Sequence, residues 1–257
     1  MLGKPITEEG LQRDLSYIVH PTIYHEAFAS VCPPRKGLDV LEVACGSGKF
    51  GLWYALKQCE VVLLDADPGV LLYTATLASK LFSAKQLARQ TDILHQRVPG
   101  LVYLIEGSVF DLERICGEER FDLILSEGLS HHFPRSDPRR QASFDEQVKV
   151  LRPGGIIAAM VSNALCPAMM EYAERVGHTY MGMPPRQEPF EPQELFAALS
   201  TAGLSGVEVL PVESRRTRLP RPSCARPEET RAGDTSESLD PFLVRSPTFG
   251  LPVRVGV

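Results

Sequence analysis

One stretch of the chain decides the fold, Asp39-Val40-Leu41-Glu42-Val43-Ala44-Cys45-Gly46-Ser47-Gly48-Lys49-Phe50-Gly51. It reads as an apolar strand, a glycine turn and the start of a helix. Glycine at such a turn lets the backbone take positive φ and pass close to a ligand. The helix that follows offers free N–H groups and a positive dipole end to a polar or anionic ligand. Gly46, Gly48 and Gly51 also fit the dinucleotide pattern G-x-G-x-x-G, which alone is weak evidence.

Strands and helices alternate on both sides of this turn. Strands are predicted at Asp39–Ala44, Glu60–Leu64, Leu101–Ile105, Phe121–Leu125 and Gly155–Val161. Helices are predicted at Phe50–Gln58, from Pro68 to about Gln90, and from about Gln141 to Leu151. This order predicts right-handed crossovers and an α/β fold, with a doubly wound, mostly parallel sheet covered by helices on both faces.

The flanking regions divide the chain into three parts. Residues 1–36 are predicted to form an N-terminal helical cap, with helical spacing over 7–31. Residues 37–212 are predicted to form the α/β domain, closed by helices near Ala168–Val176 and Pro192–Ala202 and a strand at Val207–Pro211. Residues 213–257 are rich in Pro, Arg and Ser, and Glu213–Asp240 is predicted to be a long loop. Leu251–Val257 is expected either to add a last strand beside the fifth or to fray.

Composition excludes several protein classes. The chain has 257 residues, 44% hydrophobic content and a net charge of −5, which argues against a general nucleic-acid binder but not against a local basic groove. Its six cysteines form no C-x-x-C pair, so neither a disulfide framework nor a metal site is expected. The first residues lack the apolar segment of a signal peptide, and apolar runs are shorter than the ~20 residues of a membrane span. A cytoplasmic location is expected.

The glycine turn resembles the first motif of the class I S-adenosylmethionine (SAM)-dependent methyltransferases, E/D-x-G-x-G-x-G. Glu42, Gly46 and Gly48 match that motif, whereas Ala44 replaces its first glycine. Alanine is small, and we expect it to be tolerated there if its φ is negative. The resemblance implies a Rossmann-like fold with SAM as the cofactor.

Later segments extend the resemblance in the family's order. Leu64-Asp65-Ala66-Asp67-Pro68 is similar to the element whose acid holds both ribose hydroxyls of SAM, which implies that role for Asp65. Ser108 stands where the family has an acid that contacts adenine, so the Ser108 hydroxyl or the Val109 N–H is expected to replace it, and Asp111 aligns with a later acid. The segments 121–133 and 150–155 resemble the fourth strand and the turn before the fifth.

The resemblance implies a set of cofactor-binding residues drawn from these turns. They are Glu42, Ala44, Cys45, Gly46, Ser47, Gly48, Asp65, Ala66, Ser108, Val109, Ser126 and Glu127.

The catalytic residues are not decided by sequence, and the candidates are His131, His132, Glu127 and Tyr17. Histidine titrates near neutrality and suits acid/base work. Adjacent histidines also occur in this family segment as residues that shape the turn, which is the favoured interpretation.

Two further candidates have alternatives of their own. Glu127 follows the fourth strand, where it is expected either to contact the methionine ammonium or substrate, or to be a solvated acid. The cluster Tyr17, His20, Tyr24 and His25 is expected either to close over SAM or to pack half-buried.

The function predicted is SAM-dependent methyl transfer to a small-molecule acceptor, with Met and Tyr side chains of 164–190 as candidate lining. No Asn/Asp-Pro-Pro-Phe/Tyr motif follows the fourth strand, which counts against amino-methyltransferases of adenine or glutamine. One alternative is a SAM-binding, non-catalytic sensor or partner protein. Another is an NAD(P)-dependent oxidoreductase, against which Glu42 inside the first strand weighs.

Overall fold

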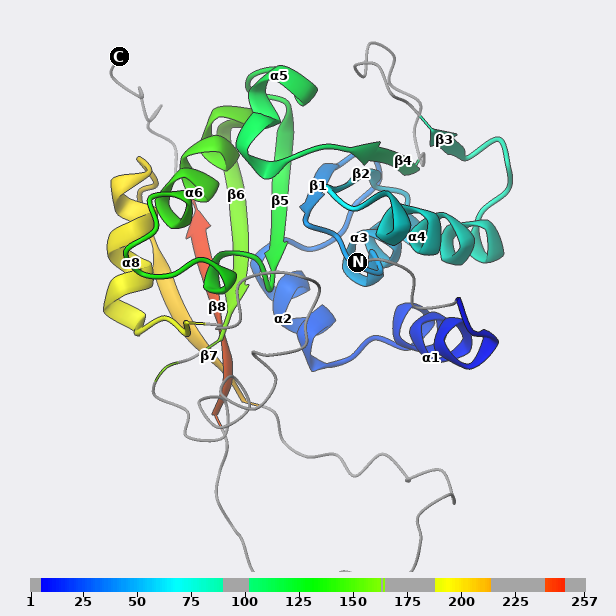
Figure 1. Cartoon of the computed structure of the whole chain (residues 1–257), viewed down its shortest axis with the longest axis horizontal. Coiled ribbons are helices and arrows are strands. Elements are labelled where there is room, and N and C mark those ends of the chain that lie inside the picture. The colour runs from blue at the N-terminus through cyan, green and yellow to red at the C-terminus, as the bar shows by residue number, and fades with distance from the viewer. Residues whose placement is uncertain (1–5, 90–101, 163, 165–187, 214–238, 248–257) are drawn as a thin grey trace, which may run out of the picture.

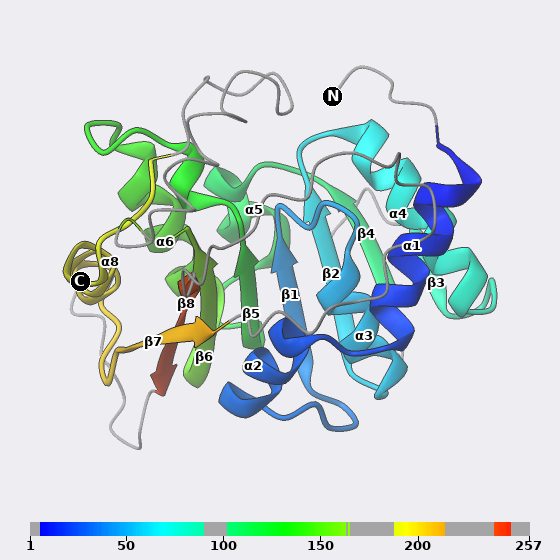
Figure 2. The ribbon, with the colours of Figure 1, turned by 90° about the horizontal axis from the view of Figure 1, so that it is seen from below.

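The computed structural model describes residues 6–89, 102–162, 164, 188–213 and 239–247. Its centre is an eight-stranded sheet in the order β3-β4-β2-β1-β5-β6-β8-β7 (Figures 1 and 2). The strands are β1 Asp39–Val43, β2 Glu60–Asp65, β3 Leu87–Arg89, β4 Val102–Glu106, β5 Phe121–Glu127, β6 Leu151–Val161, β7 Glu208–Glu213 and β8 Leu239–Pro247.

In sheet order, the first six strands (β3, β4, β2, β1, β5 and β6) pair in parallel. Strand β8 runs antiparallel to both β6 and β7. In the central pairs, Glu42 of β1 lies opposite Leu63 of β2 and Leu125 of β5. Parallel sheets are buried on both faces by their crossover helices, so their strands are continuously apolar. This arrangement confirms the predicted doubly wound, mostly parallel α/β fold.

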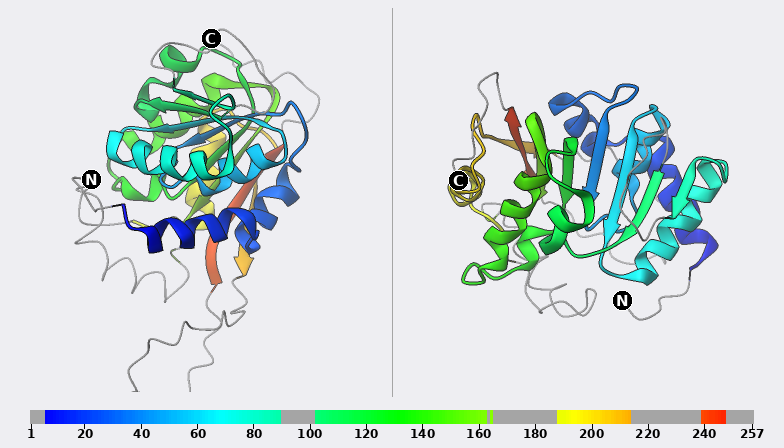
Figure 3. Two further views of the ribbon diagram at one scale, coloured as in Figure 1. Left: turned by 90° about the vertical axis from the view of Figure 1, so that its right-hand side faces the viewer. Right: turned by 90° about the horizontal axis from the view of Figure 1, so that it is seen from above.

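Helices cover both faces of the sheet (Figure 3). They are α1 Glu8–Val19, α2 Ile23–Val31, α3 Lys49–Leu56, α4 Pro68–Leu81, α5 Leu112–Cys116, α6 Arg139–Val150 and α8 Pro192–Thr201, with short 3₁₀ turns η1 Val109–Asp111 and η2 Ser130–His132. Side chains from α1 to α4 pack on one face in a first core cluster, and those from α5, α6 and α8 pack on the other face in a second.

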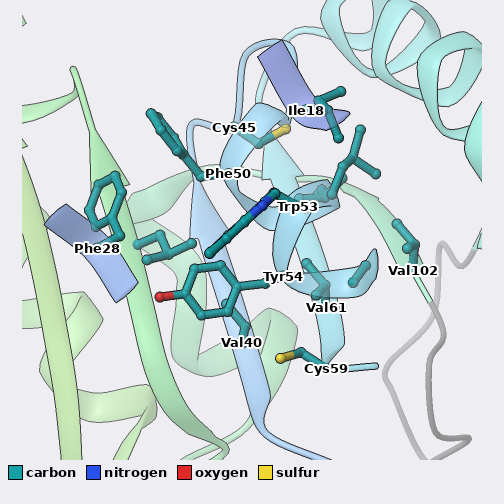
Figure 4. Close-up of a cluster of buried hydrophobic side chains, with 14 of the residues drawn as sticks. Ile18, Phe28, Val40, Cys45, Phe50, Trp53, Tyr54, Cys59, Val61 and Val102 are labelled. Atoms are coloured by element: carbon teal, nitrogen blue, oxygen red, sulfur yellow. The ribbon is translucent and has the colours of Figure 1, made fainter. Parts of the chain in front are cut away.

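The first core cluster brings the N-terminal helices onto the glycine turn's helix, α3 (Figure 4). Phe28 of α2 meets Phe50 of α3 edge to face, with ring centroids 4.8 Å apart. The fully buried Tyr54 satisfies its hydroxyl by donating to the Cys32 carbonyl at 2.7 Å. A polar group buried among apolar side chains needs such a partner, so this bond fixes α2 against α3.

Two sequence predictions were wrong at element boundaries. The helix expected to reach Gln90 ends at Leu81, and the chain then forms the three-residue edge strand Leu87–Arg89. The expected loop Glu213–Asp240 is wrong only at its two ends, where Glu213 belongs to β7 and Leu239 and Asp240 belong to β8; residues 214–238 lie outside the described part of the chain. The predicted helix at 168–176 and the alternatives for 251–257 lie outside the described residues.

No helix among the described residues is long and apolar enough to cross a membrane.

Candidate functional site

The glycine turn between β1 and α3 is a tight left-handed loop. Ala44, Gly46 and Gly48 have φ of 49°, 55° and 66°. Two backbone bonds close the loop, from the Cys45 N–H to the Leu64 carbonyl at 3.0 Å and from the Gly48 N–H to the Cys45 carbonyl at 2.7 Å. The condition of a negative φ at Ala44 is therefore not met: the residue takes a left-handed conformation that favours glycine, at a cost of roughly 1–2 kcal/mol for its Cβ.

Two glycines serve different purposes in this loop. A Cβ added at Gly46 would meet no atom within 4 Å, so the left-handed backbone there borders open space. A Cβ at Gly48 would lie 2.8 Å from Thr74 Cγ2 and 3.0 Å from Leu63 Cδ1, because α3 starts directly against α4 and β2. Gly46 thus leaves room for a ligand, whereas Gly48 permits close packing.

Glu42, on the strand that α3 covers, holds the first turn of that helix. Gly48 is the N-cap of α3 and has no side chain to satisfy the free N–H groups of the first turn. Glu42, which is 3% exposed on β1, accepts the Gly51 N–H through its Oε2 at 2.7 Å. Burial raises the pKa of Glu42 to about 8, and the nearby Glu127 charge adds to the effect. Glu42 therefore positions the loop rather than lining its open side.

Asp65 joins three turns at the carboxyl end of β2. Its Oδ2 accepts the Gly46 N–H at 3.1 Å and its Oδ1 accepts the Asp67 N–H at 3.0 Å. Its carbonyl accepts the Gly107 N–H, 3.0 Å away, from the end of β4. Burial raises the pKa of this carboxyl group above its usual value, and the backbone N–H groups counteract that rise. Ala66, the next residue, is exposed.

The sheet reverses its winding between β1 and β5, where the glycine loop, Ser126 and Glu127 lie, whereas Asp65 lies one strand away at the end of β2. Ligands of open α/β sheets bind at the carboxyl ends of strands where the order reverses. Ser126 is buried at the end of β5, and Glu127 follows it, half-exposed. The Glu127 carboxylate lies 3.9 Å from Lys49 Nζ at the start of α3.

The turn after β4 contains the predicted adenine contacts. The Ser108 hydroxyl accepts the Phe110 N–H at 3.2 Å and caps η1, and Val109 is buried in the second core cluster. Asp111 turns away and pairs with Arg114 at 2.6 Å on the outer surface. That pair borders a polar surface groove between α5 and α6, whose other lining residues are Phe110, Glu113, Glu146 and Lys149.

The two adjacent histidines differ in environment. His131 is buried, and its Nδ1 accepts the Ser162 N–H at 3.2 Å, which ties η2 to the end of β6. Burial lowers the pKa of His131 to about 3, so the ring is neutral near pH 7. His132 is half-buried beside it, with ring centroids 4.6 Å apart, and burial lowers its pKa too. The structure thus supports a structural role for His131.

The N-terminal candidates also separate. His25 is buried and links the start of α2 to α3: its Nδ1 accepts the Thr22 N–H at 3.2 Å, and its Nε2 lies 3.4 Å from the Lys49 carbonyl oxygen. Tyr17 on α1 is 39% exposed, and His20 is exposed as well. His25 is therefore a packing residue, whereas Tyr17 remains accessible.

Two other chemistries find no support in the described part of the chain. It contains no group of three or more His, Cys, Asp or Glu side chains that could hold a metal ion. Cys45 lies in the glycine loop, but burial raises the pKa of its thiol well above the usual value, which makes a poor nucleophile.

Comparison with known proteins agrees with this geometry. Residues 41–159 match the family model of a methyltransferase domain. Over 123 residues the chain is 29% identical to the tRNA U34 carboxymethyltransferase of Hydrogenovibrio crunogenus, a match that covers 47% of this chain and 31% of that relative. The chain thus matches less than a third of the length of that curated relative.

Solved structures share the fold at low sequence identity. A SAM-dependent methyltransferase from Archaeoglobus fulgidus superposes with a TM-score of 0.59 at 11% identity, covering 94% of this chain and 100% of that one. A chain from the complex between the Haloferax volcanii Trm112 methyltransferase activator and a methyltransferase gives 0.60 at 16% identity, covering 94% and 95%. Residues 41–159 thus match a methyltransferase-domain model, and the chain shares the fold of these solved methyltransferase structures.

Proposed function

We propose that this protein transfers a methyl group from SAM to a small-molecule acceptor. The observation that carries the proposal is the hydrogen bond between the left-handed glycine loop and the Asp65 carboxylate, at the carboxyl ends of β1 and β2 and next to the reversal point of the sheet. A dinucleotide-binding oxidoreductase is disfavoured because a buried glutamate, Glu42, stands inside the first strand and caps α3.

The residues present fit the shape and polarity of SAM. Each Asp65 oxygen accepts one backbone N–H, and a carboxylate oxygen has a second lone pair for a ribose hydroxyl. The open side of Gly46 leaves space for the ligand against the loop backbone. Ala66, Ser108 and Val109 border the two neighbouring strand ends and are proposed to surround the adenine. Ser126 and Glu127 are proposed to line the methionine end.

Methyl transfer from SAM requires little acid/base chemistry from the protein. SAM supplies an activated methyl group on a sulfonium, and the protein's task is to hold the attacking atom in line with it. A base is required only if the acceptor is protonated at its attacking atom. His132 is proposed for that role, because it is half-buried in η2, which follows the end of β5, and its lowered pKa leaves the ring neutral near pH 7.

A small, uncharged or cationic acceptor fits the electrostatics better than a nucleic acid. Three arginines follow η2, and each faces a carboxylate: Arg135 lies 3.4 Å from Glu194, Arg139 pairs with Asp137 at 2.6 Å, and Arg140 lies 3.2 Å from Glu194. The whole chain carries a net charge of −5. Binding to phosphates would require these cations to exchange partners.

Calorimetric titration with SAM, S-adenosylhomocysteine, NAD and NADP tests the donor assignment. Binding of the two sulfur ligands alone is expected, whereas binding of a nicotinamide ligand instead would overturn it. Transfer of labelled methyl from SAM is then followed into a metabolite extract and into bulk tRNA. Label in the small-molecule fraction is expected. Label in tRNA alone would refute the acceptor class, and label in neither would favour a non-catalytic SAM-binding protein.

A further inference from the structure

Three ionisable side chains lie beside the glycine loop, and one of them is buried. Glu42 and Glu127 lie on adjacent strands and on the same face of the sheet. Glu42 pairs in register with Leu125, and Glu127 is two residues further along β5, opposite Met160. Leu125 and Met160 both belong to the first core cluster, on the face that α3 covers. Lys49 of α3 completes the group, 3.9 Å from Glu127.

The exposure of these groups assigns them different tasks. The side chains of Lys49 and Glu127 are 35% and 39% exposed, so water solvates this pair. Glu42 is 3% exposed, and its Oε2 takes the Gly51 N–H. Ionised, Glu42 would add a second negative charge beside a pair that is already neutral. A buried charge without a counter-charge is costly. Without a bound methyl donor, the cluster therefore favours the neutral form of Glu42.

From this geometry we propose that binding of the cationic methyl donor releases a proton from Glu42, and that binding of the neutral thioether product does not. The inference rests on the proposed use of SAM. The sulfonium brings one positive charge to the loop whose helix Glu42 caps. Ionising Glu42 restores the neutrality of the cluster, and the Glu42 O–H bond breaks with its proton passing to the buffer. After methyl transfer the sulfonium charge is gone, and Glu42 takes up a proton again.

The surroundings of Glu42 agree with this cycle. Burial raises the pKa of Glu42 to about 8, the Glu127 charge raises it further, and the Gly51 N–H and Lys49 lower it. Two other titratable groups face this region. The Cys45 thiol stays protonated because burial raises its pKa, and His25 of α2 stays neutral because burial lowers its pKa to about 4. Among Glu42, Cys45 and His25, Glu42 is thus the group whose charge can change near pH 7.

The measurement is proton release on binding. Calorimetric titrations of the full chain at pH 7 with SAM and with S-adenosylhomocysteine, each in buffers of different ionisation enthalpy, give the number of protons exchanged. We expect close to one proton more for SAM than for S-adenosylhomocysteine. Over pH 6.5–7.5, SAM affinity should rise up to about tenfold more than S-adenosylhomocysteine affinity does. Equal proton numbers for the two ligands would overturn the inference.

Variants distinguish a proton released by Glu42 from one released by the ligand's own ammonium group, whose release does not depend on Glu42. Glu42→Gln keeps an oxygen for the Gly51 N–H and should lose the extra proton release. Glu118→Gln, in the exposed turn before β5, is the matched control and should behave as wild type. Unchanged release in folded Glu42→Gln would also overturn the inference. Failure of SAM to bind at any pH would refute the proposed function instead.

Discussion

Replacing Asp65 by alanine tests the donor site at its most connected residue. The side chain accepts two backbone N–H groups, from Gly46 at 3.1 Å and from Asp67 at 3.0 Å, and is proposed to accept the ribose hydroxyls. A hydrogen bond to a charged group contributes about 1.5–3 kcal/mol. Loss of one such bond to the ligand therefore weakens SAM binding about 10- to 150-fold.

Calorimetric titration with SAM measures the change in affinity. Two further variants show which property of Asp65 causes that change. Asp65→Asn keeps the side-chain shape and one acceptor oxygen, so its loss of affinity should be smaller than that of Asp65→Ala. Asp111→Ala removes an acid of the neighbouring turn that pairs outward with Arg114, and it should bind within twofold of wild type. A folded Asp65→Ala protein with wild-type affinity would remove Asp65 from the donor site and refute the reasoning.

Four other variants test the packing around the site. Ala44→Gly relieves a φ of 49° and should raise the free energy of unfolding by about 0.5–1 kcal/mol in urea titration; a destabilised variant would contradict the strain. Phe28→Ala empties a fully buried site and should cost about 3–5 kcal/mol in the same assay, whereas Ile23→Ala, at a 38% exposed position, should cost under about 0.5 kcal/mol. The pKa of His131 is lowered from 6.5 to about 3 in the folded chain. As pH falls below 6.5, the unfolded chain therefore binds a proton on this histidine that the folded chain does not bind, and folding stability falls. Wild type should therefore lose about 1 kcal/mol more per pH unit than His131→Asn, whose amide oxygen can still accept the Ser162 N–H; parallel pH profiles would refute this.

Sequence reasoning located the donor loop because its signals are local. The strand, the glycine turn and the acid at the next strand end are set by residues close in sequence, and β1, β2 and β5 follow the predicted strands within two residues. The positive φ at Ala44 was not predicted, because a small side chain does not reveal the φ that closure of the loop requires. The capping role of Glu42 was also missed, because it depends on how α3 returns over β1.

The sheet's ends were harder to predict. β3 has three residues and no periodicity to detect, and β8 contains Pro241 and Pro247, which argue against a strand in sequence. Its pairing with β6 joins residues more than eighty positions apart, a contact that no short window of sequence encodes.

The position of β8 between β6 and β7 orders the assembly of the polypeptide in time. Among the described strands, β7 pairs with β8 and not with β6. A ribosome that has released β7 but not residues 239–247 therefore exposes a strand with no neighbour and leaves β6 with a bare edge. Both edges could recruit other chains until β8 arrives. Completion of this sheet waits on translation of residues 239–247, which makes premature termination upstream of Leu239 a hazard for aggregation.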